Sequence, residues 1–103
     1  MVNDSHRDFV ITSKILQEIK DIKTFTEGVS LEEYLDDLKT QKAVAMSLIN
    51  IGELCGAYSQ RFLEEYKSVP WRQIRALRNM PLINMRQFHI LMYGKRFQWI
   101  FLN

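Results

Sequence analysis

The most regular pattern in this 103-residue chain is a stripe of apolar side chains at helical spacing. Its members follow one another at steps of four and three residues, and they are Val44, Leu48, Ile51, Cys55, Tyr58 and Phe62. Such steps keep side chains on one face of an α-helix, whereas a half-buried strand alternates every two residues. The stripe therefore predicts a helix whose striped face is the most buried surface of the protein.

A second stripe lies near the N-terminus and consists of Ile11, Ile15, Ile19 and Ile22. It predicts a helix over about residues 6–26, which Ser5 and Asp8 would cap and which ends before Gly28. Ser30-Leu-Glu-Glu33 has the pattern of a capping box, so another helical stretch begins after it. That stretch covers residues 31–65, and we expect Asp36-Asp37 to divide it into a short helix and a long one.

Gly52 and Gly56 lie four residues apart inside the long helix, where each costs roughly 1 kcal/mol relative to alanine. We expect another helix to approach closely at this point. A further helix begins at Ser68-Val-Pro-Trp71 with Pro70 in its first turn, and Pro81 limits it to about residue 80. The side chains expected to face the core are Trp71, Ile74 and Leu77.

These elements together predict an all-α fold, a small antiparallel bundle of four to five helices over residues 1–80. Residues 81–103 fit neither helical nor strand periodicity well. The last seven, Phe97-Gln-Trp-Ile-Phe-Leu-Asn103, are aromatic and uncharged, a composition that promotes aggregation when exposed. We interpret residues 81–103 as an atypical hydrophobic and basic tail of the same domain.

Charge is distributed unevenly along the chain. The formal net charge is +2, yet residues 1–70 carry 8 Lys and Arg against 12 Asp and Glu, a net of −4. The remainder carries no acidic residue, and its basic residues are Arg72, Arg75, Arg78, Arg86, Lys95 and Arg96. An acidic body with a basic end favours an anionic partner such as a nucleic acid, with a solvated basic face as the alternative.

Several other classes of protein are disfavoured. No run of eighteen apolar residues is present, so we expect no transmembrane helix and no membrane partner. The N-terminus lacks the order of a signal peptide, and the single cysteine, Cys55, cannot form an internal disulfide. Both observations favour the cytoplasm, with Cys55 as a small core residue. Because no metal-ligand spacing, phosphate-binding glycine loop or Ser-His-Asp arrangement is recognisable, we expect neither metal nor cofactor.

Three pieces of sequence carry a family resemblance: Ile51-Gly-Glu-Leu54, Tyr66-Lys-Ser-Val-Pro-Trp-Arg-Gln-Ile-Arg75 and Ala76-Leu-Arg-Asn79. In order and spacing they resemble the HepT-like family of the HEPN superfamily, over about residues 5–80. The resemblance implies a metal-independent RNase toxin of a toxin–antitoxin system. It also implies a homodimer, which the two glycines and the remaining apolar surface suggest as well, and a nucleotidyltransferase-type antitoxin as partner.

In that family an arginine-asparagine pair is followed by a histidine, with four to six residues between arginine and histidine, and often by a tyrosine two residues further. The resemblance implies that Arg78 stabilises charge on the phosphorane while the histidine transfers a proton. Arg72 and Arg75, at three-residue spacing before Arg78, form a basic ridge that could contact RNA phosphates. The alternatives for this ridge are a solvated face or ion pairs, including those of a dimer.

The second half of the motif is missing. The positions that would hold the histidine are Ile83, Asn84 and Met85, and the next histidine, His89, has ten residues between it and Arg78. On a regular helix that spacing separates the two by roughly 16 Å, too far for one phosphate. His6, near the N-terminus, is expected to be inert. The sequence therefore predicts a chain with little or no cleavage activity, unless the fold returns His89 to Arg78.

A deletion of one base explains the tail. When the codons after Met80 are read one base earlier, allowed codon choices give Ala-Ala-His-Lys-Tyr-Glu-Ala-Ile-Ser-His-Ile-Asp-Val-Trp-Glu. This frame supplies the missing histidine, with four residues between it and Arg78, and the tyrosine two residues beyond. A genuinely divergent tail is the alternative. For the chain as it stands, the rival functional hypothesis is a non-catalytic helical module that binds a nucleotidyltransferase-like antitoxin or RNA.

Overall fold

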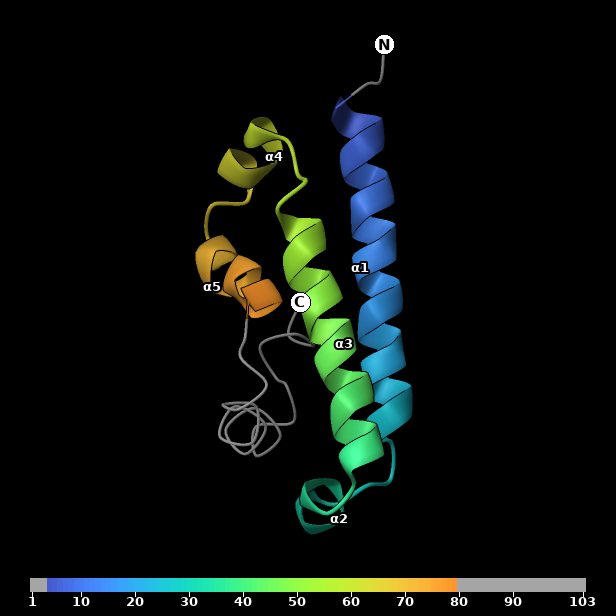
Figure 1. Ribbon diagram of the computed structural model, residues 1–103. Coiled ribbons are helices and arrows are strands. Elements are labelled where there is room, and N and C mark those ends of the chain that lie inside the picture. The colour runs from blue at the N-terminus through green and yellow to red at the C-terminus, as the bar shows by residue number, and fades with distance from the viewer. Residues whose placement is uncertain (1–3, 80–103) are drawn as a thin grey trace.

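The protein is described here by a computed structural model, in which residues 4–79 are placed (Figure 1). Within these residues, five α-helices and a 3₁₀-helix follow one another: α1 (Asp4–Thr26), α2 (Leu31–Leu35), α3 (Leu38–Cys55), α4 (Gln60–Glu65), α5 (Trp71–Ala76) and η1 (Leu77–Asn79). Residues 4–79 contain no strand, so the predicted all-α class is confirmed. The predicted boundary at residue 80 lies at the edge of the described residues and stays a prediction.

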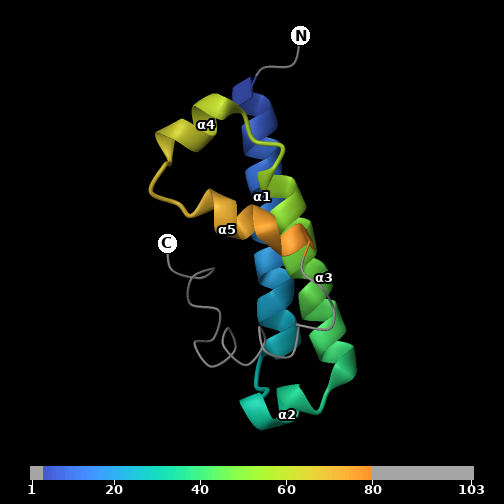
Figure 2. The same ribbon diagram turned by 60° about the vertical axis from the view of Figure 1, so that its left-hand side comes forward.

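The two long helices, α1 and α3, lie antiparallel and side by side, as both views of the ribbon show (Figures 1 and 2). The short helix α2 closes the bundle at the end where α1 gives way to α3. Gly28 makes the turn there with a φ of +72°, a conformation that glycine adopts without steric cost. At the other half of the bundle, α5 and η1 pack against α3.

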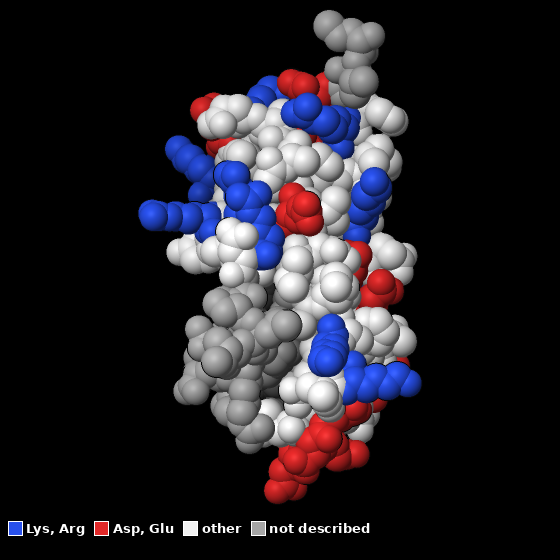
Figure 3. Space-filling view, viewed as in Figure 1, with Lys and Arg blue, Asp and Glu red and all other residues white. Residues whose placement is uncertain are grey.

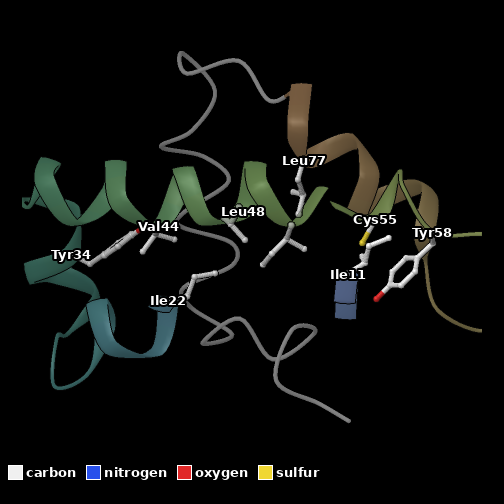
Figure 4. Close-up of a cluster of buried hydrophobic side chains, with 9 residues drawn as sticks. Ile11, Ile22, Tyr34, Val44, Leu48, Cys55, Tyr58 and Leu77 are labelled. Atoms are coloured by element: carbon white, nitrogen blue, oxygen red, sulfur yellow. The ribbon is translucent and has the colours of Figure 1, made fainter. Parts of the chain in front are cut away.

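The core lies between α1 and α3 and beneath η1 (Figure 4). The predicted stripe is buried from Val44 to Tyr58, and its last member, Phe62, is partly buried against the same cluster. From α1 the core takes the four predicted isoleucines, with Ile11 and Ile22 buried and the two between them partly buried. The prediction that the stripe is the most buried surface is thus confirmed for the described residues.

The predicted division at Asp36-Asp37 is confirmed, and hydrogen bonds explain it. Ser30 and Glu33 form both bonds of the capping box at the start of α2. Asp37 caps α3 by accepting a hydrogen bond from the backbone amide of Thr40 at 3.1 Å. The side-chain amide of Gln41 donates to the carbonyl oxygens of Tyr34 and Leu35, which satisfies the end of α2.

Two predicted boundaries were wrong. The helix expected to reach residue 65 ends at Cys55, and α4 begins only after Ser59. The caps expected for α1 are absent: Ser5 lies inside α1, which starts at Asp4, and its hydroxyl accepts a hydrogen bond from Arg61 at 2.6 Å. Asp8 lies in the second turn of α1. Its carboxylate does not cap α1 but accepts a hydrogen bond from Ser59, which lies outside this helix.

Asp8 and Ser59 explain the second break. One oxygen of the buried Asp8 carboxylate accepts from the Ser59 amide at 2.9 Å, and the other accepts from the Ser59 hydroxyl at 2.6 Å. The same hydroxyl oxygen accepts from the amide of Phe62 and so caps α4. Burial alone would raise the pKa of Asp8, but these two hydrogen bonds, with the charges of Arg7 and Arg61, lower it below its usual 3.8.

We expect Asp8→Ala to lower the free energy of unfolding at pH 7 by about 2–4 kcal/mol, because the buried amide of Ser59 loses its acceptor. Since the pKa of Asp8 is lower in the folded protein, this contribution is present above pH 3.8 and is lost as the pH falls through the folded value. Urea unfolding at pH 7 and near pH 3 measures both effects. Asp21→Ala is the control, because within the described residues the Asp21 carboxylate accepts a single, exposed hydrogen bond, from the side-chain amide of Gln17. Equal losses in the two variants would contradict the assigned role.

None of the helices within residues 4–79 combines the length and the apolar character that crossing a membrane requires.

Candidate nucleic-acid interface

The helix that carries the predicted arginines starts at a short turn. Pro70 is the N-cap residue immediately before α5 and does not lie in the first turn as predicted; its carbonyl oxygen accepts from the amide of Ile74 at 3.1 Å. The indole N–H of Trp71 donates to the carbonyl oxygen of Tyr66 at 3.0 Å, which ties the start of α5 to the end of α4. At the other end, Leu77 is buried in the core. Both ends of α5 are therefore fixed.

Gly52 allows this segment to lie directly on α3. A β-carbon at residue 52 would stand 2.7 Å from the amide nitrogen of Arg78 and 2.9 Å from the carbonyl oxygen of Ile74. Both are backbone atoms that cannot move aside alone, so only glycine permits the contact. The predicted close approach is confirmed at Gly52. Because the neighbour belongs to the same chain, the glycines no longer support the dimer that they suggested in sequence.

We expect Gly52→Ala to destabilise the protein by about 1–3 kcal/mol, as overpacking does, despite the better helix propensity of alanine. Gly56→Ala is the matched control. Gly56 ends α3 with a φ of −69°, and a β-carbon there meets its nearest atom, the Glu53 carbonyl oxygen, at 3.3 Å. Its arginine neighbours at 3.6 and 3.7 Å are flexible side chains that can shift. Thermal and urea unfolding should separate the two variants, and a Gly52→Ala protein as stable as wild type would contradict the packing.

Two arginine side chains converge over the C-terminal end of α3. The point where a β-carbon of Gly56 would stand is 3.6 Å from Nη1 of Arg78 and 3.7 Å from Nε of Arg75. The C-terminal end of a helix carries partial negative charge, which offsets the repulsion between two cations held close together. The fold thus brings Arg75 and Arg78 into one cationic site.

The arginine site borders a shallow open depression of about 360 Å³. Its lining consists of Trp71, Arg72, Arg75, Ala76, Arg78 and Asn79. Basic side chains gather over α5, and acidic side chains gather at the α2 end (Figure 3). Within residues 4–79, no carboxylate oxygen lies within 4.0 Å of a guanidinium nitrogen of these three arginines. Within the described part of the chain, these three charges are therefore not used in ion pairs between helices. They are available to bind an external anion.

The depression can hold negative charge, but its described lining offers no group that transfers a proton near neutral pH. Cys55 is buried and does not line the depression, and burial raises the pKa of that thiol to about 11 against the opposing charge of Arg75. Cys55 is therefore the small core residue that was predicted. His6 lies exposed in the first turns of α1 and is not part of the lining. His89 lies outside the described residues.

The predicted site residues are brought together, although their roles stay predictions. Arg72, Arg75 and Arg78 all border one depression, as the three-residue spacing indicated. Sequence reasoning missed Trp71 and Asn79 as lining residues. Trp71 was predicted only as a core residue, yet its four-residue spacing to Arg75 places both on one side of α5. No cluster of three or more potential metal ligands occurs within residues 4–79.

The fold and the depression define a small helical bundle that presents an unpaired cationic face within the described residues. The profile of the ribonuclease HepT-like family matches residues 15–82, two thirds of the chain. The chain belongs to this family.

Two relatives illustrate the match. A candidate RNase of Methanocaldococcus jannaschii is 43% identical over 65 residues, which cover 63% of this chain and 54% of the relative. A candidate ribonuclease HepT of Thermococcus cleftensis is 33% identical over 75 residues, 73% of this chain and 66% of the relative. The chain thus spans between about half and two thirds of the length of these relatives. No solved structure matches it significantly.

Proposed function

We propose that the protein is an RNA-directed toxin domain in which Arg75 and Arg78 bind a phosphate of the RNA backbone. The single observation that carries this proposal is the convergence of their guanidinium groups over the end of α3, with no carboxylate within 4.0 Å among residues 4–79. Arginine donors match the oxygens of a phosphate in geometry and charge. Arg72, on the rim of the same depression, would contact a neighbouring phosphate.

Metal-independent cleavage of RNA needs more than phosphate binding. The 2′-hydroxyl must lose a proton as its oxygen attacks phosphorus, and the leaving 5′-oxygen must gain one. Arg78 can stabilise the negative charge that develops on the phosphorane between these steps. Because the described lining holds no proton donor or acceptor suited to either transfer, we propose that cleavage by this chain is severely impaired.

The test is an RNA cleavage assay in EDTA, run beside a binding assay with the same RNA. The proposal predicts binding with at most a trace of cleavage, and loss of that trace in Arg78→Ala. Lys42→Ala is the matched control, since Lys42 is exposed on α3 roughly 20 Å along the helix from Gly56. Full turnover would show that another group, such as His89, completes the site. Absence of binding would overturn the proposal.

The second candidate is a non-catalytic interaction module, and the lack of a proton-transferring group in the described lining favours it. Such a module would use the same arginines to bind RNA or a nucleotidyltransferase-type antitoxin. Binding of RNA without any cleavage, with an affinity that Arg78→Ala weakens, would support it. Co-purification with a nucleotidyltransferase encoded by an adjacent gene would identify that nucleotidyltransferase as the antitoxin partner.

We further propose a homodimer that works in the cytoplasm. Phe9 and Leu16, seven residues apart on α1, are 69% and 47% exposed, and Met46 on α3 is 58% exposed. Large apolar side chains on the long helices offer surface for a second copy.

The proposed location in the cytoplasm has separate support, because the free thiol of Cys55 fits a reducing compartment. The test of the dimer is its oligomeric state in solution. Sedimentation that shows only monomer at micromolar concentration would count against the dimer.

A further inference from the structure

Trp71 is the one aromatic side chain that borders the arginine depression within the described residues. It is only partly buried, although its ring packs against the aromatic cluster behind it. The Trp71 ring meets Tyr58 edge-on at a centroid distance of 5.4 Å and is tilted against Phe62 at 6.0 Å. Tyr58 and Phe62 are themselves stacked at 4.1 Å. The indole is therefore held in place while part of it remains accessible.

The polar end of the indole is also fixed. Its N–H already donates to the carbonyl oxygen of Tyr66, so it does not need a ligand to satisfy it. What the partly exposed indole can still offer a ligand is apolar ring surface, in a depression that Ala76 and the three arginines also line. A rigid aromatic surface beside a cationic site suits a planar aromatic ligand that carries a negative charge at one end.

A nucleotide has this combination of parts. We infer that Trp71 forms a subsite for an unpaired RNA base, which packs on the indole while the adjoining phosphate lies at Arg75 and Arg78. The inference rests on the proposed phosphate site and specifies its substrate as single-stranded RNA. A base in a duplex has both faces covered and cannot reach the ring, whereas an unpaired base can. The depression, at about 360 Å³, lies at the small end of the range for ligand sites, about 300–1,000 Å³.

The test uses the full chain with the substitution Trp99→Phe. The sequence has two tryptophans, so Trp71 is then the sole source of tryptophan fluorescence. The probe is a short single-stranded 2′-O-methyl RNA, which cannot be cleaved. Its matched partners are the same backbone with abasic sites and the same sequence as a duplex. Affinity is measured by anisotropy of a labelled strand, and contact with the indole by quenching of Trp71 fluorescence.

The inference predicts that the complete single strand quenches Trp71, while the abasic strand and the duplex do not. The abasic strand should bind about 5- to 150-fold more weakly than the complete strand. Trp71→Leu, in the chain with native Trp99, should weaken binding of the complete strand by a similar factor and leave the abasic strand unchanged. Trp71→Phe keeps an aromatic ring and should recover part of the loss. A purely structural role would change binding of both strands equally.

The outcomes separate this inference from the proposal on which it rests. If complete and abasic strands bind equally, and both depend on Arg75 and Arg78, the base subsite is wrong and the phosphate site stands. If no strand binds, both are wrong. Should Trp71→Leu fail to fold by circular dichroism, Trp71→Phe and the quenching comparison still decide, because neither depends on that variant.

Discussion

Adding one base after codon 80, so that translation continues in the alternative frame, will raise metal-independent RNA cleavage by about 10²–10⁴-fold. The alternative frame can place a histidine after Arg78 with four residues between them, and a tyrosine two residues further. The histidine would supply the proton transfer that the described lining lacks, next to an arginine that the fold already holds in place. The expected gain is the usual contribution of a positioned acid or base.

The measurement compares initial rates of RNA cleavage in EDTA for the chain as it stands and for the frame-restored chain. The control is the restored frame with an alanine codon in place of the histidine codon, which keeps the new tail and removes only the imidazole. This control should cut no faster than the original chain. An immediate stop codon in the alternative frame, or a restored chain with unchanged activity, would contradict the deletion hypothesis.

Arg78→Ala in the restored chain will lower kcat by about 10²–10³-fold, the loss typical of removing one donor that stabilises an anionic transition state. The fold should survive this change, because Arg78 is exposed and the anchor of the segment is its buried neighbour Leu77. Lys42→Ala removes the same charge far from the depression and should retain wild-type kcat. Circular dichroism establishes that both variants are folded.

An equal loss in the two variants would assign the effect to general electrostatic attraction of RNA. A loss confined to KM in Arg78→Ala would assign Arg78 to ground-state binding of substrate and not to the transition state. Either result would contradict the proposed stabilisation of the phosphorane by Arg78.

Much of the fold follows from local sequence signals. The capping box at Ser30 and the cap at Asp37 act over three residues, so the division between α2 and α3 was predictable. The isoleucine stripe likewise predicted the buried face of α1. The end of α3 at Cys55 was not predictable in this way, because the contact that stabilises the break joins Asp8 to Ser59, 51 residues apart. The apolar stripe continues across the break and conceals it.

The candidate site shows the same limit. Three-residue spacing predicted that the arginines share a ridge, and the structure places them around one depression. Their position over the end of α3 depends on the contact at Gly52, and sequence predicted that contact without identifying the partner. The sequence predicted Trp71 only as a core residue, and the base subsite proposed for it rests on its packing and its position in the lining, which the structure gives together.

The most direct test of the phosphate site is the salt dependence of binding to single-stranded RNA. The chain as it stands, the Arg75→Ala/Arg78→Ala double variant and Lys42→Ala are titrated against the same labelled strand at several salt concentrations. Each arginine that neutralises a phosphate of a single strand contributes about 0.7 to the slope of log K against log salt. The account predicts weaker binding and a slope reduced by about that amount per arginine in the double variant, with Lys42→Ala like wild type. The same affinity and slope in all three proteins would contradict it.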